Sequence, residues 1–358
     1  MGGAPDRLSP APMMPPPVEE RRFQSFDGTE IAYQALGQGR PILLCNGLGG
    51  GWEAWSHQIQ YFRDRYRLLS WDYRGMYDSQ SPKDPSAVTV ADHARDALAL
   101  LQEEGAERAA LVGWSMGGQV ALELFRAAPD KVAALAMVNG VAGRPWDYVF
   151  NLNLLGRVLP PFLRGLRSMP RTIEGVVRQA TRLPDPGEWV KRVGLAAGTF
   201  DAQLADVVIG KFRSLDMDRF IGQLEQMGEH DAWDLLPLID VPVLIIAGTR
   251  DVLTPRSAAE RMARRIRGSE IMLIPGATHY AALEYPEMLN LRLEKFLRER
   301  GYEAAPGGAG CRLRVEPLAI ESNDSRHRQL RLVYLQPGSV SGRARGGGRG
   351  PAQRCRVG

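Results

Sequence analysis

The segment LVGWSMGGQV, residues 111–120, places one serine among glycines where an apolar run gives way to a helical pattern. Gly113 and Gly117 flank Ser115 in the pattern G-x-S-x-G, which at a strand-to-helix junction holds the serine on a sharp turn with its hydroxyl exposed. A serine hydroxyl is a weak nucleophile at neutral pH, so it needs a base, an acid that orients the base, and donors for the oxyanion that forms. On its own, Ser115 could equally be the N-cap of a helix.

Two later residues could supply the base and the acid. His279 lies in IPGATHYAALEYP, directly after the last apolar run, and Asp251 lies in IIAGTRDVLTP, after the run before it. Because the carboxyl ends of parallel strands meet at one edge of a sheet, we expect both side chains near Ser115. A turn or cap role before Pro255 is the alternative for Asp251. The competing acids precede the strand and so lie at its other end: Asp231, Asp234 and Asp240.

A glycine-rich loop could supply the oxyanion donors. LLCNGLGGGW, residues 43–52, directly follows an apolar run, and such a loop can turn backbone N–H groups toward a reacting centre. The helix that starts after Ser115 adds the positive end of its dipole. We predict that the N–H groups of Leu48 and Met116 form the oxyanion hole. Gly47 and Trp114, next to these groups, are predicted to contact the substrate.

Short apolar runs alternate with helical patterns along most of the chain. The runs are PILLC (41–45), YRLLSW (66–71), AALVGW (109–114), AALAMVN (133–139), VPVLIIAG (241–248) and EIMLIPG (270–276). Interleaved with helices such as VADHARDALALLQEEG, they predict parallel strands covered on both faces. Before them, RFQSFDGTEIAYQAL predicts an antiparallel hairpin with a two-residue turn at Asp27-Gly28. Thr89 and Asp92 predict a capping box at the start of a helix.

The alternation stops between Asn139 and Val241. This stretch has helical patterns, several prolines, many aromatic residues and no clear buried strand. A structureless connection of that length would be implausible in a compact domain. We therefore predict a helical insertion over residues 144–236, between two parts of an α/β core at 22–143 and 237–302. Most of its aromatic side chains should pack its own core, and some could line a pocket beneath it.

With these parts placed, residues 22 to about 300 resemble the α/β-hydrolase superfamily, in particular its capped serine carboxylesterases, lactonases and carbon–carbon hydrolases. The order Ser115, Asp251, His279 is the chain order of that superfamily's triad. WDYRGMYDSQSP, residues 71–82, is similar to its D-x-R-G-x-G-x-S segment. The resemblance implies a mostly parallel eight-stranded sheet flanked by helices, with a helical cap, or lid, inserted after the sixth strand.

The sequence departs from that superfamily at two places. Asn46-Gly47 stands where its members usually have His-Gly, which questions the anchoring of the oxyanion loop. Tyr77 stands where the D-x-R-G segment has a second glycine, so we expect a differently shaped loop after the fourth strand. Asp72 and Arg74 are expected to brace these loops and not to take part in catalysis.

The net charge of +4 belongs to the C-terminal tail. From Glu303 onward ten Arg face four acidic residues, giving +6, so residues 1–302 sum to 4 − 6 = −2. Residues 303–358 are too rich in Gly and Arg to bury an apolar face, and we predict that they are largely disordered, as is the Pro-rich segment 1–21. Arg/Gly segments can bind RNA. A solvated tail, or non-native coding beyond the true end of the gene, is favoured, and no nucleic-acid partner is expected.

The chain contains no run of roughly 18 apolar residues and no apolar signal segment at its N-terminus, so we expect a soluble, cytoplasmic protein. The cysteines have neither disulfide-framework nor metal-ligand spacing: Cys45, Cys311 and Cys355. Cys45, inside PILLC, is expected to be a buried core residue. The predicted chemistry requires no metal and no organic cofactor. Its partners are a small-molecule ester and water.

These observations predict a serine hydrolase that cleaves a carboxylic ester or lactone of a small, largely apolar substrate through an acyl-enzyme on Ser115. His279 would be the base and Asp251 the acid that orients it. Serine at this position excludes the dehalogenase and epoxide hydrolase chemistry of the fold, which uses Asp there. Carbon–carbon hydrolysis, thioester cleavage and acyl transfer remain open alternatives. A ligand-binding signal receptor with a slow or relic triad is the alternative from another class.

Overall fold

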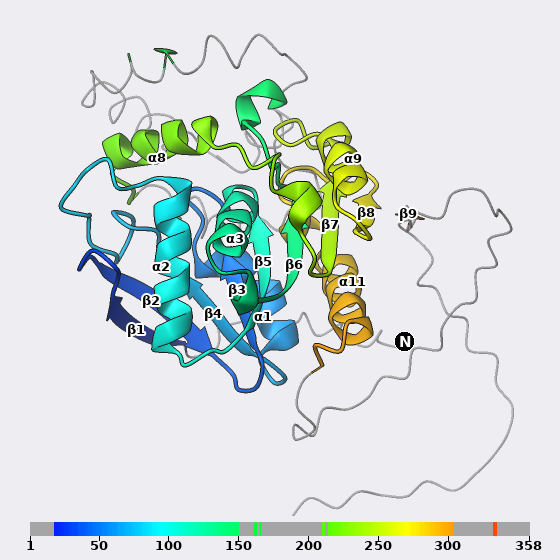
Figure 1. The fold of residues 1–358 in the computed structure, drawn as a ribbon, viewed down its shortest axis with the longest axis horizontal. Helices are drawn as coiled ribbons and strands as arrows, with labels where there is room; N and C mark the ends of the chain where they lie inside the picture. The colour runs from blue at the N-terminus through cyan, green and yellow to red at the C-terminus, as the bar shows by residue number, and fades with distance from the viewer. Residues whose placement is uncertain are drawn as a thin grey trace, which may run out of the picture.

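A computed structural model describes residues 18–149, 161–162, 165, 210–211, 214–303 and 332–334. Its centre is one sheet with the strand order β1-β2-β4-β3-β5-β6-β7-β8-β9 (Figure 1). The strands are β1 (Glu19–Gln24), β2 (Glu30–Leu36), β3 (Pro41–Cys45), β4 (Arg67–Trp71), β5 (Ala109–Trp114), β6 (Val132–Val138), β7 (Val243–Gly248), β8 (Glu270–Ile274) and β9 (Leu332–Tyr334). The predicted mostly parallel sheet of eight strands is confirmed in β1 to β8.

The six apolar runs form the parallel part of the sheet. Neighbouring strands from β3 to β8 pair in parallel, and nearly every residue of β5, β7 and β8 is buried, as expected of strands covered on both faces. β2 pairs antiparallel with both β1 and β4. All the carboxyl ends of β3 to β8 therefore lie along one edge of the sheet, which is where the predicted site residues follow their strands.

The hairpin of β1 and β2 is present, but its predicted two-residue turn is wrong. Gln24 pairs with Glu30, and the N–H of Ser25 still donates to the carbonyl of Thr29 at 2.9 Å, so three residues form the tip. Asp27 accepts from the Thr29 N–H and from the Arg74 guanidinium. These bonds to its carboxylate hold the longer turn, and the following glycine closes it with φ +80°.

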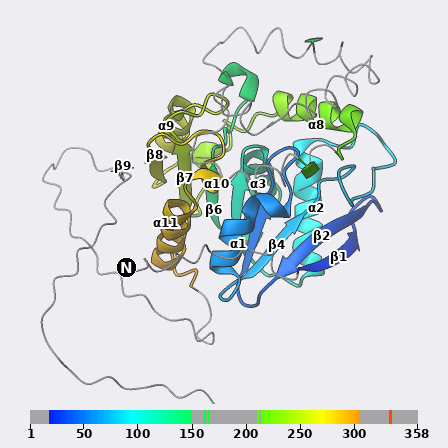
Figure 2. The same cartoon turned by 180° about the vertical axis from the view of Figure 1, so that it is seen from behind.

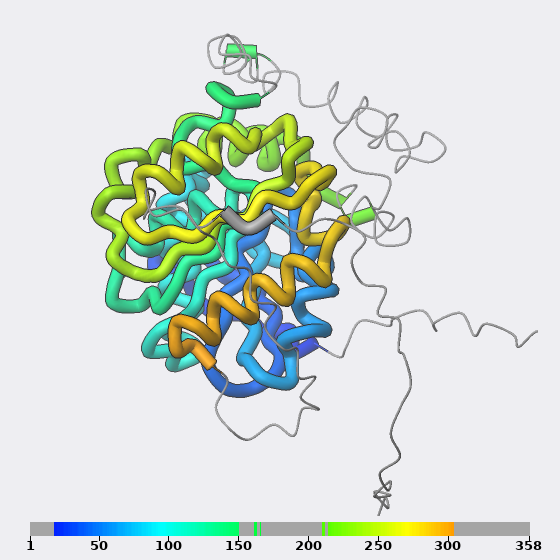
Figure 3. The backbone as a smooth tube through the Cα atoms, turned by 90° about the vertical axis from the view of Figure 1, so that its right-hand side faces the viewer, coloured from blue at the N-terminus to red at the C-terminus, as the bar shows by residue number. Residues whose placement is uncertain are grey.

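Helices cover both faces of the sheet (Figures 1 and 2). The described helices and short 3-10 turns are η1 (Trp52–Trp55), α1 (Ser56–Phe62), α2 (Val90–Glu103), α3 (Met116–Ala127), η2 (Pro129–Lys131), η3 (Pro145–Asp147), α8 (Met217–Glu229), η5 (Leu236–Leu238), α9 (Arg256–Arg265), α10 (Ala281–Glu284) and α11 (Pro286–Glu299). Buried residues of α2, α3 and α9 share one core cluster, and those of α1, α10 and α11 share the other. Figure 3 shows α11, in orange, running obliquely over its face of the molecule.

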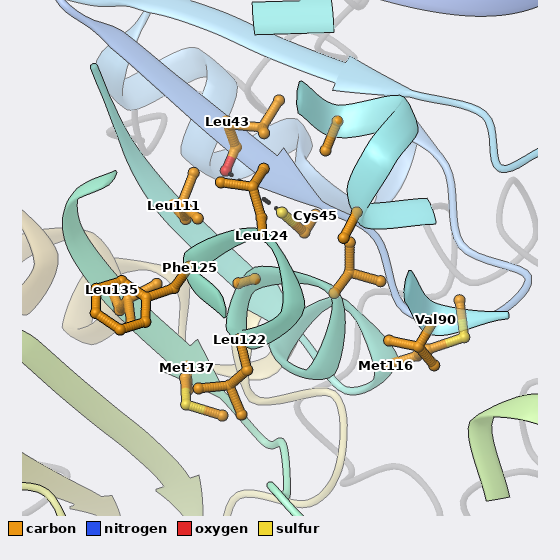
Figure 4. Packing of buried hydrophobic residues seen from close by; sticks show 14 of the residues in the cluster. Leu43, Cys45, Val90, Leu111, Met116, Leu122, Leu124, Phe125, Leu135 and Met137 are labelled. Carbon is orange, nitrogen blue, oxygen red and sulfur yellow. Dashed lines mark hydrogen bonds between the residues drawn. The ribbon is translucent and has the colours of Figure 1, made fainter. Parts of the chain in front are cut away.

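The first core cluster ties α3 to the strands beneath it. Leu111 of β5 and Leu135 of β6 pack with Leu124 and Phe125 of α3 (Figure 4). Cys45 lies in the same cluster and is fully buried, as predicted, and burial raises the pKa of its thiol well above the usual range. The packing fixes α3, and with it the turn that precedes its first residue.

Polar contacts begin α2 and position α8. The predicted capping box at Thr89 and Asp92 is confirmed, with both reciprocal bonds present. α8 contacts segments that follow strand ends: Gln223 donates to the Arg74 carbonyl, and the Met227 carbonyl accepts from Gln119 of α3. α8 thus lies over the carboxyl edge of the sheet, within the predicted insertion. Most of the predicted 144–236 insertion lies outside the described residues, so its boundaries and helical content stay a prediction.

The tail is described at only three residues. Leu332–Tyr334 form β9, which pairs in parallel with β8, so these residues of the segment predicted to be disordered belong to the sheet. The rest of the tail beyond Glu303, with Cys311 and Cys355, lies outside the described residues, as does the segment before Val18. The predicted boundary of the disordered N-terminal segment at residue 21 is wrong, because β1 begins at Glu19 and pairs with β2. No helix in the described ranges is long and apolar enough to cross a membrane.

Candidate active site

The turn that carries Ser115 is strained and tightly enclosed. Ser115 joins β5 to α3 with φ 56° and ψ −119°, a backbone conformation that a non-glycine residue rarely adopts. A Cβ at Gly113 would lie 2.4 Å from the Gly117 carbonyl oxygen, and a Cβ at Gly117 only 2.0 Å from that of Cys45. Both glycines are therefore required for strand and helix to pass. Ser115 is half-buried and its side chain makes no capping hydrogen bond, which argues against the N-cap interpretation.

The structure brings Asp251 and His279 together. Asp251 follows β7, His279 follows β8, and the Asp251 Oδ2 lies 2.9 Å from His279 Nδ1. Both side chains are buried. The loops that carry them are packed closely, because a Cβ at Gly248 would lie 2.4 Å from the Ala277 carbonyl oxygen. An acid in this place can fix one tautomer of the imidazole and leave the other ring nitrogen for proton transfer.

Two further residues, missed in the sequence, hold the acid. Asn139 Nδ2 donates to Asp251 Oδ2 at 2.6 Å and to the Thr278 carbonyl at 3.1 Å. Thr254 Oγ1 donates to the same Asp251 oxygen at 2.5 Å, and its N–H donates to Oδ1. A signal for Asn139 was available, since it is a polar residue directly after a buried apolar run. It also has φ 46°.

These bonds keep Asp251 ionised. Burial alone would raise the pKa of the Asp251 carboxyl, but the charge and the hydrogen bond of His279, with the bonds from Thr254, outweigh burial and lower the pKa below its usual value. An ionised carboxylate beside Nδ1 stabilises an imidazolium that forms during proton transfer. The electrostatics of the pair therefore suit the base role predicted for His279.

Trp114 connects the Ser115 turn to the loop that carries His279. In the described residues no hydrogen bond joins the Ser115 hydroxyl to the imidazole. Trp114, the residue before Ser115, donates from Nε1 to the His279 carbonyl at 2.9 Å, and the two rings lie 5.9 Å apart. Catalytic hydrogen bonds are commonly long in unliganded enzymes and tighten with substrate. The chain thus places both groups at one edge of the sheet.

The oxyanion loop is anchored despite its departure from the superfamily pattern. Asn46 Nδ2 donates to the Trp71 carbonyl at 2.8 Å, and Asn46 Oδ1 accepts from Trp55 Nε1 at 2.9 Å. The loop then turns at Gly47, whose carbonyl accepts from the Gly50 N–H at 2.9 Å. Asparagine therefore holds the end of β3 with both atoms of its amide. The question raised by the missing histidine is answered at this position.

Leu48 and Met116 lie on two segments that meet, the loop after β3 and the start of α3. Leu48 is half-buried in the loop, and Met116 is the buried first residue of α3. The start of α3 lies directly on the end of β3, since a Cβ at Gly117 would also approach the Asn46 carbonyl oxygen to 2.8 Å. The two predicted oxyanion donors are thus on adjoining segments. Their role stays a prediction.

Tyr77 takes the conformation of the glycine that it replaces. Its φ is 48°, in the left-handed region that usually requires glycine. The Tyr77 hydroxyl donates to the Gly49 carbonyl at 2.6 Å, and Lys211 Nζ lies 4.6 Å from the centre of its ring. These contacts compensate a strained backbone. They also tie the loop after β4 to the oxyanion loop, which glycine could not do.

Asp72 and Arg74 occupy structural positions, as expected. Arg74 is fully buried and binds both oxygens of Asp96, at 2.8 and 2.6 Å, as well as Asp27 and the Ala87 carbonyl. Asp72 is also fully buried, and its carboxylate accepts from the Asp78 N–H at 3.3 Å. Burial raises the pKa of Asp72 to about 6. Asp96 thus has a direct ion-pair partner, whereas among the described residues Asp72 has none.

A cavity of about 250 Å³ lies between the loop after β4 and α8. Its walls include Arg74, Ser81, Val88, Arg219 and Gln223, and none of the predicted catalytic residues. We therefore do not assign it to the reaction. In the described ranges there is no group of three or more His, Cys, Asp or Glu side chains that could hold a metal ion.

Known proteins resemble this chain over most of its length. The "Putative carbamate hydrolase RutD" of Azorhizobium caulinodans is 27% identical over 270 residues, which cover 75% of this chain and 96% of that protein. A protein of the same name from a Caulobacter species is 30% identical, with 72% of this chain and 90% of that protein covered. Among solved structures, the esterase EaEST from Exiguobacterium antarcticum is 21% identical, covers 77% of this chain and 98% of that chain, and has a TM-score of 0.63.

The strand order, the strained serine turn and the buried acid–histidine pair define an α/β enzyme of the hydrolase class. The chain belongs to the alpha/beta hydrolase family, whose model matches residues 42–290. That match includes both strands of the predicted acid and base and the whole serine turn.

Proposed function

We propose that this hydrolase cleaves a carboxylic ester or lactone of a small, largely apolar substrate through an acyl-enzyme on Ser115. One observation carries the proposal: a half-buried serine on a strained turn shares the carboxyl edge of the sheet with a buried Asp251–His279 pair joined at 2.9 Å. This arrangement has the parts that nucleophilic catalysis by serine requires.

In the proposed mechanism, His279 takes the proton of the Ser115 hydroxyl as Oγ attacks the carbonyl carbon. Asp251 holds the imidazole in the required tautomer and stabilises the imidazolium. The tetrahedral intermediate collapses, the carbon–oxygen bond breaks, and the leaving alkoxide takes the proton from His279. Water then loses a proton to His279 and attacks the acyl carbon. The bond from that carbon to Ser115 Oγ breaks, Oγ takes the proton from His279, and the acid is released.

The N–H groups of Leu48 and Met116 are proposed to bind the negative oxygen that forms in both steps. The proximity of the β3 loop to the start of α3 supports this assignment. The N-terminal end of α3 adds a positive dipole end near the same point. Gly47 and Trp114 are proposed to border the bound substrate.

The test is labelling followed by turnover. The wild-type protein should react with a fluorophosphonate at Ser115 and should hydrolyse short to medium acyl esters over many turnovers. The variant Ser115→Ala should do neither. A single burst without turnover would favour the ligand-binding receptor, and clear preference for acetate esters or charged substrates would contradict the apolar substrate class.

Carbamate cleavage is a second candidate, because the two relatives described above carry that activity in their names. A carbamate carbonyl also accepts attack by a serine, but it yields a carbamoyl-enzyme. Matched pairs of substrates separate the two: an ester and a carbamate with the same alcohol group, compared by kcat/KM. A higher value for the ester supports the first proposal, and the reverse order replaces it by the second.

A further inference from the structure

Trp114 contacts both the loop that carries His279 and the glycine-rich loop after β3. It is the last residue of β5 and precedes Ser115 directly. Its side chain is only 8% exposed and lies in the core cluster on the α1 and α11 face of the sheet. A side chain this enclosed has most of its surface against protein and little left for a substrate.

One side of the indole holds the loop of the base. Nε1 donates to the His279 carbonyl at 2.9 Å. The indole centre lies 5.9 Å from the His279 ring and 5.5 Å from the Tyr280 ring. Asp251 orients the imidazole at Nδ1, and Trp114 fixes the backbone from which that imidazole projects. The two contacts together set the position of the base.

The indole also packs on the oxyanion loop. A Cβ at Gly47 would lie 2.9 Å from Trp114 Cε3, and a Cβ at Gly50 would lie 3.1 Å from Cζ3. The ring thus touches the loop backbone on both sides of Leu48, the predicted donor. At Gly47 the indole is the nearest group that a Cβ would meet, and at Gly50 the Gly47 carbonyl oxygen lies equally close.

From these contacts we propose that Trp114 is a positioning residue that sets the separation of the oxyanion loop and His279 around Ser115. The inference rests on the proposed function and adds a role beyond any contact with substrate. A displacement of about 1 Å in such an arrangement can cost about 100-fold in rate. Trp114 therefore acts on the reaction through the two loops that it contacts, by setting the distance between them.

The first test is Trp114→Phe, which keeps an aromatic ring and removes the N–H donor. We expect kcat to fall about tenfold and KM to stay within about twofold, because the binding surface for substrate changes little while the base loses its anchor. Trp233→Phe is the matched control: Trp233 Nε1 donates to the Tyr148 hydroxyl at 3.1 Å, away from the site, and its loss should leave kcat unchanged.

A readout independent of turnover is the downfield proton NMR signal of the Nδ1–H bond between His279 and Asp251. In Trp114→Phe this signal should shift and exchange faster with water, and in Trp233→Phe it should not change. Gly47→Ala, which pushes a methyl group against the indole, should reproduce the shift and lower kcat about 100-fold, which covers the case in which Trp114→Phe fails to fold.

The outcomes separate this inference from the proposed function. If the wild type shows no turnover that depends on Ser115, the proposed function fails, and the NMR comparison still decides the role of Trp114. An unchanged signal in both Trp114→Phe and Gly47→Ala would overturn the inference. A rise in KM with kcat unchanged would overturn it too, and would assign Trp114 to substrate contact alone.

Discussion

Asp96 and Asp251 are both buried acids with a nitrogen-bearing partner. Asp96 is paired with Arg74 and Asp251 with His279, and of these two partners only the histidine can exchange a proton. Arg74 binds both oxygens of Asp96 and is held by further acceptors, and a guanidinium does not release its proton in proteins. Asp251 binds one nitrogen of His279, and an imidazole, unlike a guanidinium, can both accept and donate a proton. Burial and ion pairing alone stabilise the fold, as at Arg74 and Asp96. A pair that can exchange a proton, on the same sheet edge as a strained serine, is what we propose as the reactive site.

The largest expected effect comes from removing the proposed nucleophile or the proposed base. Ser115→Ala and His279→Ala should each lower kcat by about 10⁴ to 10⁶, and the double variant should be little worse than either, because the residues act as one unit. Hydrolysis of a chromogenic ester measures kcat, and circular dichroism checks the fold. Losses that multiply in the double variant would contradict a shared step.

Breaking the other pair should cost stability and not rate. Arg74→Met leaves Asp96 as a buried, uncompensated charge, so the free energy of unfolding should fall by about 3–5 kcal/mol. The kcat of the folded fraction should stay within about threefold. Urea unfolding measures the stability change. A large fall in kcat with unaltered stability would mean that Arg74 belongs to the site.

A third buried acid, Asp72, should make the stability of the protein depend on pH. Its pKa, raised to about 6, lies above the ordinary value, so the folded state binds this proton more tightly than the unfolded state. The resulting stabilisation is present below about pH 4 and is lost as the pH rises through about 6. Asp72→Asn should therefore gain roughly 1–3 kcal/mol over the wild type at pH 8 and nothing at pH 4.

The opposite sign applies to Asp251, whose lowered pKa gives stability that is lost only as the pH falls through that lowered value. Urea unfolding of the wild type and of Asp72→Asn at pH 4 and pH 8 checks the prediction for Asp72. An equal difference between variant and wild type at the two pH values would contradict it, because a change in packing alone does not depend on this proton.

The smallest expected effect concerns the bond between the loop after β4 and the glycine-rich loop after β3. Tyr77→Phe removes the hydroxyl that donates to Gly49 and should lower the free energy of unfolding by about 1 kcal/mol. Because Gly49 follows the predicted donor Leu48, kcat should fall less than tenfold. Steady-state kinetics measures the change in kcat, and urea unfolding measures the change in the free energy of unfolding. A complete loss of activity would show that this loop depends on the hydroxyl alone.

The sequence predicted β3 to β8 well because each contains a short apolar run that the sheet buries on both faces. It also placed Ser115, Asp251 and His279 after the correct strands, since each motif follows such a run. The tip of the first hairpin is held by a local bond from the Thr29 N–H to Asp27 and by the Arg74 guanidinium, which is far away in the sequence. Only the contact with Arg74 has no local pattern.

The contacts of Asn139 and Trp114 join segments that are far apart in the sequence. Asn139 holds Asp251 because the ends of β6 and β7 are neighbours in the sheet, whereas Thr254 holds it from three residues further along the same loop. The sequence predicted Trp114 only as a substrate contact, and its contacts with the glycine-rich loop and the His279 loop require the fold. Tyr77 could be noted as unusual, but its bond to Gly49 requires the fold.

The most direct measurement is a crystal structure of the protein after reaction with a phosphonate ester. The proposed triad predicts phosphorus bonded to Ser115 Oγ, the phosphoryl oxygen within hydrogen-bond distance of the N–H groups of Leu48 and Met116, and His279 Nε2 within that distance of Oγ. Phosphorus on another residue, or an imidazole turned away from the adduct, would contradict it.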